Sequence, residues 1–306
     1  MTPGRDCFSV RVLPREPIVD KVYQIAKNTF RESIRDKILY VIAFFAAVMM
    51  FSSLALGWIS IGDQLQVVQD FSLATLSVFG ALMAVFVGTG LIYKEVDKRT
   101  IYTIISKPVH RWQFLLGKYL GLLAVLALAM VGMLIASLAF VVYAAYTSPY
   151  SPIPDWTMRV NWGWFAMAVV MLFFELMVVV SLAMFFGSIA SPILSAIFTF
   201  SAYLVGQVSA TIKDMFTTFQ PEKESVAAIT GESLTDFASN TYFILKPFSE
   251  FIYYVLPDLQ HFQLRNQVVL GPAPTFAQVG TAMLYGIGYS AAVMLLTILL
   301  FDRKRF

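Results

Sequence analysis

The sequence predicts an all-α integral membrane protein with six transmembrane helices. Of its 306 residues, 58% are hydrophobic and only 13% are charged, and the mean hydropathy is +0.72. Soluble domains contain about 45–50% apolar and about 25% charged residues. The apolar residues also come in runs of about 20 or more, the length that a helix needs to cross a membrane. This composition excludes a water-soluble enzyme, a secreted disulfide scaffold and a disordered regulator.

The apolar runs set the positions of the expected spans. The first begins too late and is too long for a cleaved signal peptide. Ser191 and Pro192 separate the fourth run from the fifth. Backbone groups in lipid must pair within their own segment, so each run is expected to be a helix. We place the spans, within the transmembrane domain 38–301, at about residues 38–60, 71–93, 119–146, 162–189, 193–211 and 276–301.

The basic residues predict the orientation. With both termini on one face, that face contains residues 1–37, 94–118 and 302–306, and with them 17 of the 22 Lys and Arg residues. The other face contains 10 of the 19 acidic residues, most of them in the long segment 212–275. Lys and Arg concentrate in short cytoplasmic loops. We therefore expect cytoplasmic termini, a cytoplasmic tail at 302–306 and an extracellular loop at 212–275.

Segment 1–37 contains an amphipathic pattern directly before the first span. Basic residues occupy much of one face, and apolar residues recur at three- and four-residue spacing on the other. Such a helix lies in the membrane interface, where each basic residue gains about 1 kcal/mol from anionic lipid. It anchors the first span, offers a docking surface for a cytoplasmic partner, or does both. The apolar positions are Val22, Ile25, Ala26, Thr29, Phe30 and Ile34, and the basic ones Lys21, Lys27, Arg31, Arg35 and Lys37.

The cytoplasmic loop 94–118 has more order in its pattern than a linker. Residues 100–106 suit one or two helical turns with a cytoplasmic surface. Ser106 is placed to cap a second helix with Pro108 in its first turn, where the missing N–H costs nothing. Arg111 and Lys118 would project from this helix just before the third span. The alternative is a solvated basic loop that only obeys the positive-inside rule.

The loop 212–275 changes character halfway. Its first half is acidic and polar, whereas residues 242–262 are aromatic and apolar. Pro247 and Pro257 confine any helix there to about ten residues, too short to span a bilayer. Such a segment suits a helix lying at, or dipping into, the outer leaflet. Whether 241–263 is re-entrant stays open at this point.

The sequence contains no recognisable catalytic constellation. It has no phosphate-binding loop, because Gly117 and Lys118 are followed by Tyr119 and lack the upstream glycine. It has no zinc-protease helix and no complete nucleophile elbow. Its single cysteine, Cys7, and two histidines, His110 and His261, are too few for a metal centre of those residues. We predict that the chain is not an enzyme and binds neither metal nor nucleic acid.

Glu175 is the one ionisable residue near the middle of a span. A charge at a helix centre costs about 2.5–3.5 kcal/mol on insertion scales for comparable residues, so Glu175 should face the bundle interior or be protonated. One interpretation is structural, a carboxyl group bonded to Ser, Thr or Tyr of a neighbouring helix. The other is a place on a proton relay or translocation path.

Small residues that allow close helix packing are Gly80, Gly88, Gly90, Ala202, Gly206, Gly286 and Gly288.

The loop 94–118 resembles the type-2 ABC exporter permeases. Those proteins carry an acidic residue, a Gly-Thr, a Leu-Leu-Ser run, a Pro-Val-x-Arg and a Gly-Lys that opens the third helix. Here Glu95 is followed by TIYTIISKPVHR at residues 100–111 and by LLGK at residues 115–118. Arg99 stands where the family usually has glycine. The resemblance extends to the basic lead-in, the six spans, the long outer loop and the short basic tail.

This resemblance implies a permease subunit that pairs with a second permease, identical or related, and with two separate ABC ATPases. The ATPases would bind ATP and Mg, whereas this chain would bind no cofactor. The second and fifth spans would line the route, and the location would be the inner or plasma membrane of a bacterium. The residues that match the coupling helix and its surroundings are Glu95, Arg99, Thr100, Ile101, Ile104, Ser106, Pro108, Arg111 and Lys118.

Two other functions compete with an exporter subunit. One is an intramembrane enzyme that uses Glu175. The other is a permease-like mechanotransmitter or scaffold that moves no substrate and drives a periplasmic or extracellular partner through 212–275. For an exporter, the low charge of the spans and the aromatic outer loop fit lipid-like or amphipathic cargo better than small ions.

Overall fold

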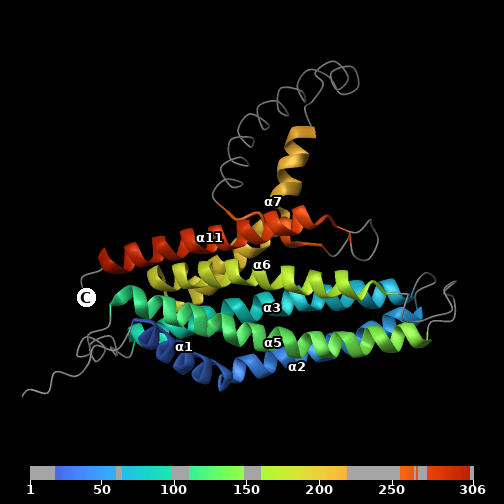
Figure 1. The fold of residues 1–306 in the computed structure, drawn as a ribbon, viewed down its shortest axis with the longest axis horizontal. Helices are drawn as coiled ribbons and strands as arrows, with labels where there is room; N and C mark the ends of the chain where they lie inside the picture. Colours follow the sequence, from blue (N-terminus) through green and yellow to red (C-terminus); the bar gives the residue numbers. More distant parts are fainter. Residues whose placement is uncertain are drawn as a thin grey trace, which may run out of the picture.

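The computed structural model describes residues 18–59, 64–97, 110–147, 160–218, 256–264, 267 and 274–303. Every regular element in these ranges is a helix, which confirms the predicted all-α fold class (Figure 1). One element is a single 3-10 turn, η2. The elements are α1 (Ile18–Ile34), α2 (Lys37–Ile59), α3 (Gln64–Asp97), α5 (Arg111–Thr147), α6 (Trp162–Ile189), α7 (Pro192–Thr218), η2 (Leu259–Phe262) and α11 (Phe276–Arg303).

Six of the described helices are long and apolar enough to cross a membrane, and each coincides with one predicted span. Two of them begin earlier than expected. Helix α3 starts at Gln64 rather than at residue 71, because a helix can continue past the hydrocarbon into polar surroundings. Helix α5 is continuous from Arg111, so Lys118 lies in the spanning helix and not in a separate helix before it. The apolar parts are Lys37–Gly57, Leu65–Gly90, Trp112–Thr147, Trp162–Ile189, Pro192–Ser209 and Phe276–Phe301.

Helices α3 and α6 form the centre of the bundle. Helix α3 contacts α2, α5, α6 and α7, and α6 contacts α3, α5, α7 and α11. Glycines bring the two central helices together: a Cβ on Gly80 would lie 2.7 Å from Leu176 Cδ1, and one on Gly88 would lie 2.8 Å from Ala183 Cβ. Gly90 and Gly288, also predicted to allow close packing, have no described atom within 4 Å of an added Cβ.

Helix α1 packs against the first turns of α5. All six residues of its predicted apolar face are buried or half-buried, whereas Lys27 and Arg31 are exposed. The contact is close because two glycines, four residues apart, carry no side chain on α5. A Cβ on Gly117 would lie 2.8 Å from Ile25 Cβ, and one on Gly121 would lie 2.7 Å from the Ala26 carbonyl oxygen. The face that the sequence assigns to the membrane interface therefore contacts protein.

The remaining helix boundaries follow from local chemistry. The Asn161 side chain accepts a hydrogen bond from the Trp164 N–H and caps the start of α6. Helix α6 ends at Ile189, and Pro192 opens α7 at the position where its missing N–H costs nothing. The break predicted at Ser191 and Pro192 is thus confirmed.

Substitution of Gly121 by alanine should loosen α1 from α5. In an isolated helix this change is favourable by about 1 kcal/mol. Here the new Cβ would lie 2.6 Å from Thr29 Cβ and 2.7 Å from a backbone oxygen of α1. Overpacking of this kind costs about 1–3 kcal/mol, so trypsin cleavage after the exposed Lys27 and Arg31 should speed up roughly five-fold or more.

The matched control for this experiment is Gly132→Ala. Gly132 lies on the same helix but has no described atom within 4 Å of an added Cβ. Its cleavage rate should stay at the level of the unmodified chain. Equal rates for the two variants would contradict the close α1–α5 contact.

Candidate functional site around Glu175

Glu175 lies near the middle of α6 and is completely buried, with 0% of its surface exposed. The prediction that it faces the bundle interior is therefore confirmed. Its Oε1 accepts a hydrogen bond of 2.6 Å from Gln207 Nε2 on α7. Ser77 Oγ on α3 lies 3.5 Å from the same oxygen, at the limit of a hydrogen bond. Three helices therefore converge on this carboxyl group.

A second shared contact ties these helices together. The hydroxyl groups of Ser77 and Tyr203 lie 3.2 Å apart, so α3 and α7 are linked beside Glu175 as well as through it. Ser77 is a partner of the kind that the structural interpretation expects, whereas Tyr203 reaches the carboxyl group only through Ser77. Gln207 is the strongest partner and was not singled out in the sequence. The signal available in the sequence was that Gln207 is a polar residue near the end of the predicted span 193–211.

The other carboxyl oxygen of Glu175 is unsatisfied. Oε2 is buried and forms no hydrogen bond to any residue that the structure describes. Among those residues, no Lys, Arg or His pairs with Glu175 either. Buried polar atoms are hydrogen-bonded in the large majority of cases, and an exception calls for an explanation. Both described hydrogen-bond donors therefore lie at Oε1, and Oε2 lacks a donor.

Residues 256–264 enter the bundle next to this site. The 3-10 helix η2 contacts α6, α7 and α11, and both Leu259 and Phe262 have 0% exposure. Glycines again make room. A Cβ on Gly206 of α7 would lie 2.7 Å from the Pro257 oxygen, and one on Gly286 of α11 would lie 3.0 Å from the Phe262 ring.

This packing changes the interpretation of the loop 212–275. Helix α7 continues to Thr218, beyond the predicted end of the span, and part of the loop's second half is buried among the spanning helices. Of the segment 241–263, residues 256–263 are described: Pro257, Asp258, Leu259 and Phe262 are buried, whereas His261 and Gln263 are exposed. Residues 241–255 lie outside the part that the structure describes.

Gln207 connects residues 256–264, here called the inserted segment, to Glu175. Gln260 Nε2 donates to the Gln207 carbonyl oxygen at 2.7 Å and to Thr211 Oγ1 at 2.8 Å. Gln263 Nε2 donates to Gln207 Oε1. The same amide group of Gln207 thus accepts from the segment and donates to Glu175.

Contacts within the segment and to α11 also hold its backbone in place. Asp258 Oδ1 accepts from the Gln260 N–H at 3.0 Å, and Asp258 Oδ2 lies 3.0 Å from His261 Nδ1. The Asp258 N–H donates to the Tyr285 hydroxyl of α11 at 2.9 Å. These contacts fix the backbone turn that presents Gln260 and Gln263 to α7.

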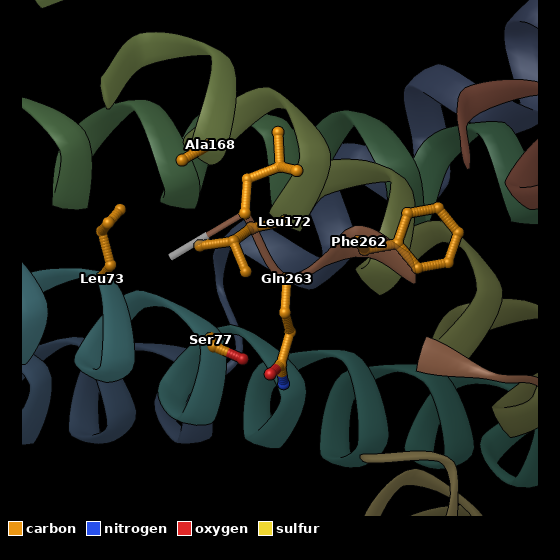
Figure 2. A pocket seen from close by; sticks show the side chains of 7 residues that line it. Leu73, Ser77, Ala168, Leu172, Phe262 and Gln263 are labelled. Carbon is orange, nitrogen blue, oxygen red and sulfur yellow. The ribbon is translucent and has the colours of Figure 1, made fainter. Parts of the chain in front are cut away.

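A small pocket of about 30 Å³ lies between α3, α6 and the inserted segment. Figure 2 shows Leu73 and Ser77 on α3, Ala168 and Leu172 on α6, and Phe262 and Gln263 on the segment around it. Leu264 completes the lining. Ser77 and Gln263 are its polar residues, and both belong to the hydrogen-bond network of Glu175. The pocket is therefore apolar on most sides and polar where it meets the network.

Only some of the predicted coupling residues lie in the part of the chain that the structure describes. Glu95 is near the end of α3 and Arg111 begins α5, while Arg99, Thr100, Ile101, Ile104, Ser106 and Pro108 lie outside the described residues. The start of α5 is capped by His110, whose N–H donates to Gln113 Oε1 while its carbonyl oxygen accepts from the Gln113 N–H.

Lys118 was expected to project from a helix just before the third span, but it lies within α5. Its side chain is only 2% exposed, and Nζ lies 4.9 Å from the centre of the Phe114 ring. A lysine stem packs along apolar surface and its ammonium group is attracted to the face of an aromatic ring. In this structure Lys118 is part of the packing of α5.

Gly206→Ala should displace the inserted segment. The added Cβ would meet the Pro257 oxygen at 2.7 Å and Leu259 Cγ at 2.9 Å, so the segment must move. At an overpacking cost of about 1–3 kcal/mol, a cysteine placed at the buried Leu264 should react roughly five-fold faster or more with an impermeant maleimide. The single native cysteine, Cys7, is first replaced by serine.

Gly288→Ala is the control, because no described atom lies within 4 Å of its added Cβ. The labelling rate of the Leu264 cysteine should be unchanged in that background. If Gly206→Ala also leaves the rate unchanged, the segment does not pack against α7 as described.

Comparison with known proteins connects these features to a family. The chain matches the family described as ABC-2 family transporter protein over residues 23–306. The match begins within α1 and includes all six candidate spans. No relative is found among curated proteins. Because the match takes in nearly the whole chain, the protein belongs to the ABC-2 family of transporter proteins.

Proposed function

We propose that this chain is the permease subunit of an ATP-driven exporter and that a separate ABC ATPase drives it. Family membership carries the proposal: it makes the chain a multi-pass membrane subunit of a transporter and implies an ABC ATPase as partner. Hydrolysis of ATP, with its Mg, takes place in that partner. Export across the inner or plasma membrane, with both termini cytoplasmic, follows from the resemblance and from the basic residues of one face.

The arrangement of the helices supports coupling through the segment between α3 and α5. Helix α3 ends at Asp97 and α5 begins at Arg111. Figure 1 shows the end of α3, the start of α5, helix α1 and the end of α11 at the same end of the bundle. An ATPase docked at this end would contact the residues that resemble a coupling helix, from Glu95 through Ser106.

Movement at this end would reach the centre of the bundle directly. Helix α3 contacts four other spanning helices and carries Ser77 beside Glu175. Helix α1, held against Gly117 and Gly121, would move with α5. A displacement of the segment between α3 and α5 would therefore be passed on by α3 and by the packed pair of α1 and α5. In the proposed assembly a second permease, identical or related, forms the other half of the route.

The first test of this function is affinity purification of the chain from native membranes in mild detergent, followed by identification of its partners. We expect an ABC ATPase at near-equal stoichiometry. Recovery of the chain alone, or with unrelated proteins, would reject an ATPase-coupled permease.

Glu95→Gln together with Thr100→Ala should weaken the ATPase complex. A hydrogen bond to a charged group contributes about 1.5–3 kcal/mol, so the affinity of the purified permease for its ATPase should fall about tenfold or more. Thr147→Ala, at the opposite end of α5, is the matched control and should keep normal affinity. Unchanged affinity in the double variant would contradict coupling through residues 94–106.

A further inference from the structure

We propose that the polar centre around Glu175 binds the ammonium group of an amphipathic primary amine. The binding site belongs to this chain alone. That the bound amine is transported cargo rests on the proposed exporter function. The proposal comes from the unsatisfied oxygen of Glu175, the neutral partners around it and the mainly apolar pocket beside it.

In its ionised form, Glu175 requires a positive or hydrogen-donating ligand. Its described hydrogen-bond partners, Gln207 and Ser77, are neutral, and so is Tyr203 beside Ser77, so an ionised Glu175 has no counter-charge among them. A protonated Glu175 would carry its hydrogen without a described acceptor, because Oε2 forms no hydrogen bond. In both protonation states one atom of the carboxyl group lacks a partner, at a considerable cost in a membrane interior.

An ammonium group fits this deficit better than a metal ion. It brings a positive charge and three N–H donors, and the site offers acceptor oxygens on Glu175, Ser77 and Tyr203. Calcium and magnesium prefer six or more oxygen ligands, including several carboxylates or waters. The described part of the chain contains no group of three His, Cys, Asp or Glu residues that could hold a metal. Glu175 is a single carboxylate among amide and hydroxyl groups.

The pocket beside the site accounts for the amphipathic part of the ligand. Ser77 links the pocket to Glu175, and Leu73, Leu172, Phe262 and Leu264 make most of its wall apolar. An alkyl chain would lie against these side chains while the ammonium group enters on the side of Ser77 and Gln263, the two polar side chains labelled in Figure 2. The lining of a ligand site typically combines apolar walls with a few placed polar groups in this way.

The size of the pocket shows what must move. A volume of about 30 Å³ has room for water but not for an alkyl chain. Three of the lining residues, Phe262, Gln263 and Leu264, belong to the inserted segment. Withdrawal of this segment would enlarge the pocket and break the hydrogen bond from Gln263 to Gln207. The segment therefore closes the site in the structure described.

Binding of radiolabelled octylamine to the purified full-length chain in lipid nanodiscs tests the proposal. Empty nanodiscs give the background from partition into lipid. We expect saturable binding of one amine per chain. In Glu175→Gln the affinity should fall about ten- to a hundred-fold, as expected for loss of a hydrogen bond to a charged group. Thr199→Val, which alters another buried polar residue of α7 outside the network, should bind normally.

Competition experiments identify the ligand chemistry. Octyltrimethylammonium keeps the charge and the alkyl chain but has no N–H donor, so it should compete at least tenfold more weakly than unlabelled octylamine. Octanol should not compete. Displacement by sodium or potassium chloride, with choline chloride inactive at equal ionic strength, would overturn the amine in favour of an inorganic cation.

A second variant covers the case in which Glu175→Gln does not fold. Glu175→Asp keeps the charge but shortens the side chain by one methylene group, and it should also weaken octylamine binding. Equal binding by the unmodified chain and by a folded variant of either kind would overturn the proposal. The assay contains no ATPase, so failure of ATPase coupling would leave this result intact, and absence of amine binding would leave the coupling proposal standing.

Discussion

A buried carboxyl group in a membrane interior is the constraint on which the centre of this protein depends. Lipid offers no water to hydrate Glu175, so neighbouring helices must supply its hydrogen-bond partners. Gln207 of α7 and Ser77 of α3 meet at the same oxygen, and Tyr203 joins Ser77 beside it. The polar cluster thereby fixes the relative position of α3, α6 and α7, which apolar packing alone would specify less precisely.

Glycine contacts position several of the elements around that centre. Gly80 and Gly88 bring α3 close to α6, Gly117 and Gly121 receive α1, and Gly206 receives the inserted segment. In lipid there is little hydrophobic force between helices, so close packing of this kind contributes much of their association. The three contacts lie on different helices, so the central pair, the N-terminal helix and the inserted segment are each held by separate surfaces.

The elements that the sequence predicts well are those set by local patterns. All six spans, the apolar face of α1 and the interior position of Glu175 follow from hydropathy, helical spacing and the cost of a charge in lipid. Gln207 and residues 256–264 could not be found in this way. Gln207 meets residues 32 and 56 positions away in the chain, and such pairings are decided by tertiary packing. The burial of Lys118 was missed for the same reason.

The chemistry of Gln207 explains why the carboxyl group and the inserted segment cannot be treated separately. A side-chain amide donates through its nitrogen and accepts through its oxygen, and here it does both, toward Glu175 and from Gln263. A hydroxyl or a carboxylate at position 207 could not make both bonds with the same reach. A ligand bound at Oε2 shares the charge of the carboxyl group that the Gln207 amide binds at Oε1, and withdrawal of residues 256–264 removes a bond to the same amide from the other side. Because the two events act on one amide, each must change the free energy of the other, and this reciprocity is the physical basis on which occupancy of the centre can control the opening of the segment.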